Sequence, residues 1–518
     1  MIYKVHDLSV GRIFLIKLTV LVACLCSYSC TPHEPLKSPK AFTKIKTQKL
    51  DQFIENFRQN FPIPGIAIAI VSNDSVYYTA SGLSDEKNHP FTASTPFLAG
   101  SVSEPMLATA VLKLADEGKL DLDEPVIKYL PYFKMGGDNY KKVTVRHLLT
   151  HTSGVQHYNI MWDAPSFKAN ALEVTTRSIS SQQPLFKVPG TRVSRSPYNY
   201  DILADVISKV TGKPFEVYLK SEVFNHLGMS ASAFSKPKTT AMPFHINNWL
   251  TYTTKPDSLY PYNRENGGSG GFHTTAKDIS SWMFSLLNRG RAGSTDFAGD
   301  KVYEQMLSAQ FKTGKKSAIG FGWEIKEDGN QKTYIKGSQY GGFSNQVILI
   351  PGKKIGVAVT SNVAGDYNPA NLSRLVAAWL NGGQLLVPKI PVSMAMGRAM
   401  AKSGNIEDAF KTYINLKSSD PDKYDFGSAA LSQFGVNLLH RIHNKKKALQ
   451  AFQFCVAQYP QSAYAYLNLA EGYVFIKDVK NTHIALIKAK ALPDDSGVKA
   501  SYVAYLQENL QILEEKKS

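Results

Sequence analysis

The most informative segment of this chain is TPFLAGSVSEPMLATAVLKLADEGKLDLDEPVIKYLP, residues 95–131. Ser101 lies at the start of a predicted helix in this segment, and Glu104 follows three residues later. Because residues three apart on a helix are neighbours, the two side chains lie on one face. A serine after Ala-Gly at a helix start is often only a cap, so a chemical role for Ser101 depends on what the rest of the chain contains.

Further landmarks follow this segment in a fixed order. They are VTVRHLLTHTSGV (143–155), PGTRVSRSP (189–197), VFNHLGM (223–229), GGSGGFHTTAKDISSW (267–282), IGFGWEI (319–325) and GGFSNQVILIPGKKIGVAVTSN (341–362). Over residues 45–382 this order resembles the serine β-lactamase and penicillin-binding-protein-like hydrolases, a family with class C-like, DD-peptidase and esterase members. The resemblance implies an α+β domain, in which helices flank an antiparallel sheet beside an all-helical lobe.

Local patterns agree with that fold. GIAIAIVSNDSVYYTASG (65–82) has strand-type residues on both sides of Asn73-Asp74, which predicts a hairpin. VILIPGKKIGVAV (347–359) predicts a second hairpin that turns at Pro351-Gly352, and residues 371–380 have the apolar spacing of a helix. Strands near both ends of the domain, with helices between them, predict a mixed sheet that both ends complete.

The resemblance identifies Ser101 as the family nucleophile, but its usual partners are replaced. In the family, a lysine three residues after the serine takes the serine's proton. Glu104 holds that position here. The family's Tyr-x-Asn falls on Arg195-Ser196-Pro197, and its Lys- or His-x-Gly on Lys336-Gly337-Ser338. The candidate catalytic residues are therefore Ser101, Glu104, Arg195 and Lys336.

These replacements predict an ion pair in place of a base. A carboxylate is a poor base for an alcohol unless burial raises its pKa, and a neighbouring cation lowers that pKa further. We expect Glu104 within about 4 Å of Arg195, gripped through two hydrogen bonds, with Lys336 beside them. Pro197 offers no side-chain hydrogen-bonding group. The oxyanion-binding N–H groups of Ser101 and of the strand beyond Ser338 are expected to persist, because Ser338 would narrow the groove without closing it.

Two functions are compatible with this site. The first is a catalytically impaired or non-catalytic member of the family that binds a peptide-like or peptidoglycan-like ligand, or another protein. The alternative is an active serine hydrolase of the esterase, peptidase or β-lactamase type, in which Ser101 is assisted by Glu104 or Lys336 as an atypical base. Loss of the family's lysine, tyrosine and asparagine together favours the first.

The first thirty residues predict export. Lys4 and Arg12 precede the apolar run IFLIKLTVLVACLC, which is too short and interrupted for a comfortable membrane span. We predict a signal peptide over 1–30, of the lipoprotein type, with lipidation at Cys24 or Cys30, and a tether over 31–49. An ordinary secretory signal is the alternative. Lipidation would make this a bacterial envelope protein, anchored to the membrane on the periplasmic or outer-membrane side.

The C-terminal part has a different composition. A β-lactamase-like domain over 50–382 and a linker over 383–394 are followed by residues 395–518, which predict only helices and resemble tetratricopeptide repeats. Asn444 and Asp478 open equivalent second helices 34 residues apart, the period of that repeat. NIEDAFKTY (405–413) is a weaker earlier copy. An array of so few repeats buries little surface on its own, and we therefore expect it to dock on the first domain. The repeats also offer a surface for a protein partner.

Composition limits the remaining possibilities. With 518 residues, 43% of them apolar, the chain can fill two or three cores. Its net charge of +17 is spread along the chain, which fits loose attraction to anionic envelope polymers or lipid headgroups, or simply a solvated surface. No motif indicates nucleic-acid binding, a cofactor or a metal. His147 and His151 belong to the 143–155 landmark and are expected to be structural. Only Cys455 lies in the folded body, which excludes an intrachain disulfide there.

Overall fold

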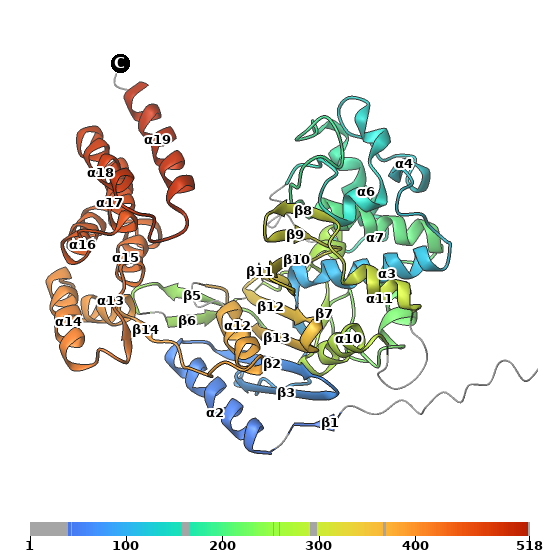
Figure 1. Cartoon of the computed structure of the whole chain (residues 1–518), viewed down its shortest axis with the longest axis horizontal. Helices are drawn as coiled ribbons and strands as arrows, with labels where there is room; N and C mark the ends of the chain where they lie inside the picture. Colours follow the sequence, from blue (N-terminus) through green and yellow to red (C-terminus); the bar gives the residue numbers. More distant parts are fainter. Residues whose placement is uncertain are drawn as a thin grey trace, which may run out of the picture.

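A computed structural model describes residues 40–515 except for 43, 158–165, 252, 258, 291–297 and 366–368. The predicted signal peptide, Cys24 and Cys30 lie outside this part. The described chain forms a main domain built on one large sheet, with a column of C-terminal helices beside it (Figure 1). None of the described helices is long and apolar enough to cross a membrane.

Nine strands form the main sheet, in the order β1-β3-β2-β13-β12-β11-β10-β9-β8. All neighbours are antiparallel except β1 and β3. β2 from the start of the domain pairs with β13 from its end, so the prediction of a sheet completed by both ends is confirmed. The strands are β1 (Lys40–Ala41), β2 (Gly65–Ser72), β3 (Ser75–Gly82), β8 (Phe311–Gly314), β9 (Ser317–Ile319), β10 (Glu324–Asp328), β11 (Gln331–Tyr340), β12 (Phe343–Ile350) and β13 (Ile355–Ser361).

Both predicted hairpins are confirmed. Asn73 begins the turn between β2 and β3 with a φ of 55°, a left-handed conformation that asparagine tolerates better than most residues. Residues 351–353 form a short 3₁₀ turn between β12 and β13. The helix predicted over 371–380 is α12 (Pro369–Leu380).

Each face of the sheet has its own core, because side chains alternate along a strand. Ile66, Ile68 and Ile70 of β2 pack with α2 (Lys44–Asn60) and α12. The intervening Ala67 and Ala69 face the opposite core. That core is covered by α3 (Ser103–Asp116), α10 (Ala276–Asn288) and the helical lobe, whose elements are α4 (Val126–Tyr129), α5 (Val145–Leu149), α6 (Ala171–Ser178), α7 (Tyr198–Thr211), α8 (Phe215–Leu219), α9 (Gly267–Gly270) and α11 (Asp300–Met306).

The C-terminal helices pack as successive pairs followed by a last helix. The pairs are α13 (Val392–Ser403) with α14 (Ile406–Ser419), α15 (Ser428–Val436) with α16 (Lys445–Gln458), and α17 (Ala463–Phe475) with α18 (Val479–Ala491), followed by α19 (Lys499–Glu515). Asn444 and Asp478 cap α16 and α18, as predicted. Tetratricopeptide identity stays a prediction.

Three details differ from expectation. The predicted tether over 31–49 is not a plain linker, because it contains β1 of the main sheet and the first residues of α2. The helix α13 begins at Val392, inside the predicted linker. The region is also not purely helical, because β14 (Ile390–Pro391) pairs with β15 (Tyr424–Asp425). Two residues per strand are too few for a sequence pattern to predict.

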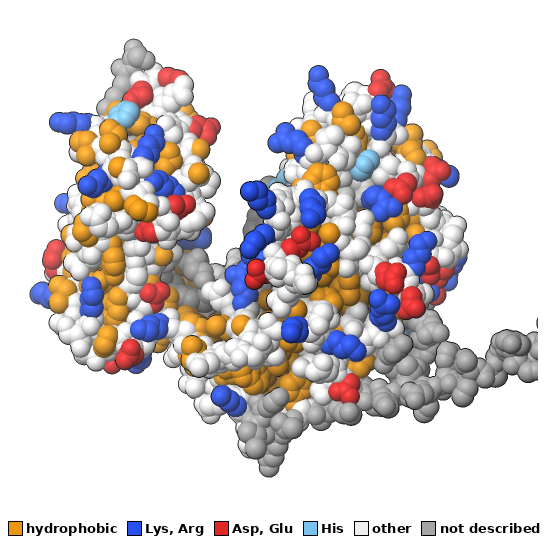
Figure 2. Space-filling model, viewed as in Figure 1, with side chains coloured by type: hydrophobic (Ala, Val, Ile, Leu, Met, Phe, Trp, Pro, Cys, Tyr) orange, Lys and Arg blue, Asp and Glu red, His pale blue; other side chains and the backbone are white. Residues whose placement is uncertain are grey.

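The helical region docks on the main domain through a hairpin, β5 (Phe244–Asn248) with β6 (Thr253–Pro256). At its tip, Asn437 Nδ2 donates to Trp249 O at 3.3 Å, and the Arg441 guanidinium lies 4.3 Å from the Trp249 ring centre. Gly397 packs so closely that a Cβ there would lie 2.1 Å from Leu250 O. The predicted docking is therefore confirmed. Farther from this contact the two bodies stand apart, with a wide groove between them (Figure 2).

Candidate functional site

Ser101 lies on a single 3₁₀ turn, η1 (Gly100–Val102), immediately before α3. Gly100 has a φ of 55°, a left-handed conformation that glycine adopts without steric cost. The turn is fixed by Ser103, whose hydroxyl donates to Gly100 O at 2.6 Å and accepts from the N–H of Phe272 at 3.0 Å. The predicted helix start is confirmed, and hydrogen bonds from Ser103 hold the turn that carries Ser101.

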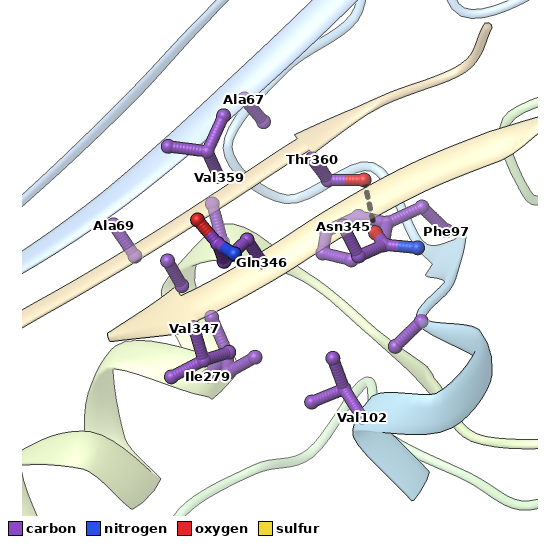
Figure 3. A pocket seen from close by; sticks show the side chains of 13 residues that line it. Ala67, Ala69, Phe97, Val102, Ile279, Asn345, Gln346, Val347, Val359 and Thr360 are labelled. Carbon is purple, nitrogen blue, oxygen red and sulfur yellow. Dashed lines mark hydrogen bonds between the residues drawn. The ribbon is translucent and has the colours of Figure 1, made fainter. Parts of the chain in front are cut away.

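The sheet also binds the segment that precedes Ser101. Asn345 on β12 donates to Leu98 O at 3.1 Å, and Thr360 on β13 donates to Asn345 Oδ1 at 2.5 Å. Figure 3 shows these two side chains meeting, with Phe97 beside Asn345, around a small void beneath the sheet. Leu98 belongs to β4 (Phe97–Leu98), which pairs with β7 (His273–Thr274). Two neighbouring strands of the sheet therefore fix the segment that carries Ser101.

Glu104 is the centre of the site. It is buried in the first turn of α3, and its Oε2 accepts from Lys336 Nζ, from His151 Nε2 at 3.1 Å and from Arg195 Nη2 at 3.4 Å. Burial opposes the charge of this carboxyl, but Lys336 and Arg195 outweigh it and hold its pKa well below the usual range. The predicted ion pair is confirmed, and Glu104 is an ionised acceptor with little basicity.

Lys336 on β11 is almost completely buried, with 1% of its side chain exposed. Burial lowers the pKa of Lys336 to about 8, while the attraction of Glu104 opposes that shift. At neutral pH the lysine is therefore still a cation held by Glu104. Its proton is shared with a carboxylate, so Lys336 is not a free base for Ser101.

His151 also belongs to the site. Its Nδ1 accepts from the N–H of Ser196 at 3.3 Å and from Asn199 Nδ2 at 3.0 Å. Two donors on Nδ1 put the single proton of the neutral ring on Nε2, where it points at Glu104. Burial lowers the pKa of His151, which keeps the ring neutral. The expectation of a purely structural histidine was therefore incomplete.

His147, by contrast, is structural as expected. It completes a reciprocal pair of hydrogen bonds with Thr144 at the start of α5. Both histidines lie in the same landmark, and only the left-handed turn at His151, with a φ of 55°, directs its ring into the cleft. Their sequence spacing gives no signal that separates the two roles.

Arg195 spans the cleft. One terminal nitrogen binds Glu104 and the other binds Glu324 Oε1 on β10, so the guanidinium does not grip Glu104 with two bonds as predicted. The reason is competition from Glu324, which lies on the opposite side of the cleft. Each of the two carboxylates binds one terminal nitrogen of the Arg195 guanidinium. Arg195 is 40% exposed. The sequence offered no signal for Glu324, which lies in the 319–325 landmark far from the candidate positions.

Ser338 on β11 changes the expected oxyanion site. Its hydroxyl accepts from the N–H of Ser101 at 2.9 Å. The prediction that this N–H stays available is therefore wrong, because the Ser338 side chain reaches it across the groove.

Pro197 is the cap residue of α7, where its fixed φ of −56° suits a helix start. Among the described residues, no group of three or more His, Cys, Asp or Glu could hold a metal ion.

A family model described as Beta-lactamase matches residues 50–378, and the chain therefore belongs to the β-lactamase family. It is 27% identical over 343 residues to Protein flp of Staphylococcus aureus (strain N315), covering 64% of this chain and 66% of that relative, just under two thirds of its length. It is 28% identical over 295 residues to the putative penicillin-binding protein PbpX of Bacillus subtilis (strain 168), covering 55% of this chain and 68% of that one. A solved structure, the octameric penicillin-binding protein homologue from Pyrococcus abyssi, aligns with a TM-score of 0.56 and 26% identity, over 69% of this chain and 82% of that one.

Proposed function

We propose that this chain is a non-catalytic, ligand-binding member of the β-lactamase family. The observation that carries the proposal is the Glu104 carboxylate, which binds Lys336, Arg195 and His151 at once. The candidate bases Glu104 and Lys336 are both held in that cluster, together with His151. Glu104 has a lowered pKa, Lys336 is paired, and the Nδ1 of His151 already accepts two hydrogen bonds.

The proposed ligand is peptide-like or peptidoglycan-like. One relative and one solved structure are named as a penicillin-binding protein or its homologue. Lys336 is paired with Glu104, and Arg195 is paired with both Glu104 and Glu324. Neither of these two cations is therefore free to bind a ligand carboxylate without breaking an existing ion pair. A ligand would contact the exposed mouth, where Arg195 and Glu324 are 40% and 53% exposed. The proposed setting is the bacterial envelope, with a lipid anchor at Cys24 or Cys30 and a protein partner on the helical region.

Covalent labelling tests this proposal. The purified chain is incubated with a fluorescent penicillin and, separately, with a fluorescent fluorophosphonate, beside an active penicillin-binding protein as positive control. We expect no covalent band on this chain under conditions that label the control. A band that disappears in Ser101→Ala would contradict the proposal and establish the alternative, an active serine hydrolase with an atypical base.

A further inference from the structure

We infer that the Ser338 hydroxyl is a built-in occupant of the oxyanion site, and that it takes the place of a ligand's acyl oxygen at the Ser101 N–H. In acyl transfer, backbone N–H groups at the nucleophile bind the oxygen on which negative charge develops. Here the Ser101 N–H donates to Ser338 Oγ at 2.9 Å, a normal hydrogen-bond length. A carbonyl oxygen could bind the same N–H only after Ser338 rotated away.

The Ser338 hydroxyl is packed closely against Gly100. A Cβ added to Gly100 would lie 2.2 Å from Ser338 Oγ and 3.2 Å from Ser338 Cβ, so the hydroxyl rests against the bare Cα of Gly100. Only 8% of Ser338 is exposed. Gly100 is thus needed twice, for its left-handed turn and for the space that the serine side chain fills.

The neighbouring strand reinforces this arrangement. Ser338 is paired in register with Asn345 on β12, and Asn345 holds Leu98 O at 3.1 Å. Adjacent residues of two paired strands therefore bind the backbone on both sides of Gly100. Because both contacts come from the rigid sheet, Ser338 is a positioning residue for the Ser101 turn as well as an occupant of the oxyanion site.

This barrier is separate from the Glu104 cluster. The Glu104 cluster leaves Ser101 without a free base, whereas Ser338 occupies the Ser101 N–H that would bind the oxyanion. The inference deepens the proposed function, on which it rests for the unreactive Ser101, by adding a specificity rule. Ligands of this cleft are those that bind without delivering an oxygen to the Ser101 N–H.

Amide hydrogen exchange at Ser101 in the full chain tests the inference directly. Ser338→Ala should accelerate exchange of the Ser101 amide about tenfold, the effect expected for loss of one hydrogen bond. Ser338→Thr, which keeps a hydroxyl, should restore protection. The matched control is Ser317→Ala on β9, which removes an exposed hydroxyl bonded to Thr313 and should leave Ser101 unchanged. Equal exchange in Ser338→Ala and the unmodified chain would overturn the inference and leave the proposed function standing.

A second comparison measures the chemical consequence. Fluorophosphonate labelling is timed in Glu104→Lys/Arg195→Tyr and in the same variant with Ser338→Gly. The glycine should accelerate labelling of Ser101 about 100-fold, the usual effect of one oxyanion donor. Equal labelling of the two variants, including no labelling of either, would overturn the inference. Labelling of the unmodified chain at Ser101 would instead overturn the proposed function.

Discussion

At the residue scale, Glu104 stands where the family has a lysine, and the charges around it compensate for that replacement. Lys336 is buried, and a buried cation needs a counter-charge to stay folded. Glu104 supplies that charge from the first turn of α3, three residues after Ser101. Arg195 then joins Glu104 to Glu324, which connects the helical lobe to β10 of the sheet. The same contacts that stabilise the cleft remove its bases.

A second buried carboxyl makes the stability depend on pH. Asp201 on α7 accepts from the N–H of Ser269 at 2.8 Å, and its Oδ2 has no hydrogen-bond partner among the described residues. Burial raises the pKa of Asp201 from 3.8 to about 8. The folded state therefore keeps a proton that the unfolded state releases, and this group lowers stability as pH rises from about 4 to about 8.

Asp201→Asn should remove this penalty, because the amide keeps the acceptor for Ser269 and carries no charge. Its stability relative to the unmodified chain should rise between pH 5 and pH 8 by about 2 kcal/mol or more. Thermal and denaturant unfolding at several pH values would measure the difference, with the exposed Asp328→Asn as control. Parallel pH curves for Asp201→Asn and the unmodified chain would contradict the assignment.

At the scale of single elements, local side-chain chemistry fixes where the C-terminal helices begin. Asn405, Asn444 and Asp478 each accept a backbone N–H in the first turn of α14, α16 and α18. The residues just before them, Gly404, His443 and Lys477, all have positive φ. Each pair of helices is therefore joined by the same left-handed turn followed by a cap.

The caps give a test of this arrangement. Asn444→Ala should weaken α16 by about 1 kcal/mol, because the N–H of Lys447 loses its acceptor, which lies at 3.1 Å. Asp478→Ala should do the same to α18, where the N–H of Asn481 lies 3.0 Å from the carboxylate. Asn444→Asp is the matched control and should preserve stability, because a carboxylate also caps and suits the helix dipole. Local hydrogen exchange in α16 and α18 would report each effect, and an unchanged α16 in Asn444→Ala would contradict it.

At the scale of the whole molecule, the helical region depends on the main domain for part of its burial. The hairpin tip covers α13 at Gly397 and lies against Asn437 and Arg441, which follow α15. Leu250 packs against the core of the helical region. Few repeats bury little surface on their own, so this contact stabilises the array.

Separating the two parts should therefore affect them unequally. We expect residues 31–385 to fold alone, because they contain every strand of the main sheet. Residues 390–518 should be less stable alone than in the full chain, because the β5–β6 tip is missing. Circular dichroism during thermal unfolding of both fragments and of the full chain would show this. Cooperative unfolding of the helical fragment at the temperature seen in the full chain would contradict the expectation.

Features that depend on neighbours along the chain could be predicted from the sequence alone. Turn residues fixed the hairpins at 73–74 and 351–352, cap residues fixed the starts of α16 and α18, and helical spacing placed Glu104 beside Ser101. Together with the order of the landmarks, these signals predicted the fold. The fold brings the loop of Arg195 beside the helix of Glu104, and the contact between these two residues was predicted from that.

The remaining contacts of the site arise from the packing of segments that are far apart in the sequence. His151 reaches Glu104 across 47 residues, Glu324 competes for Arg195 across 129, and the Ser338 hydroxyl reaches the Ser101 N–H across 237. Such contacts depend on the direction of each side chain after the sheet and the helical lobe have packed. Sequence spacing carries no information about that direction, because one residue type can point to the cleft, the core or solvent.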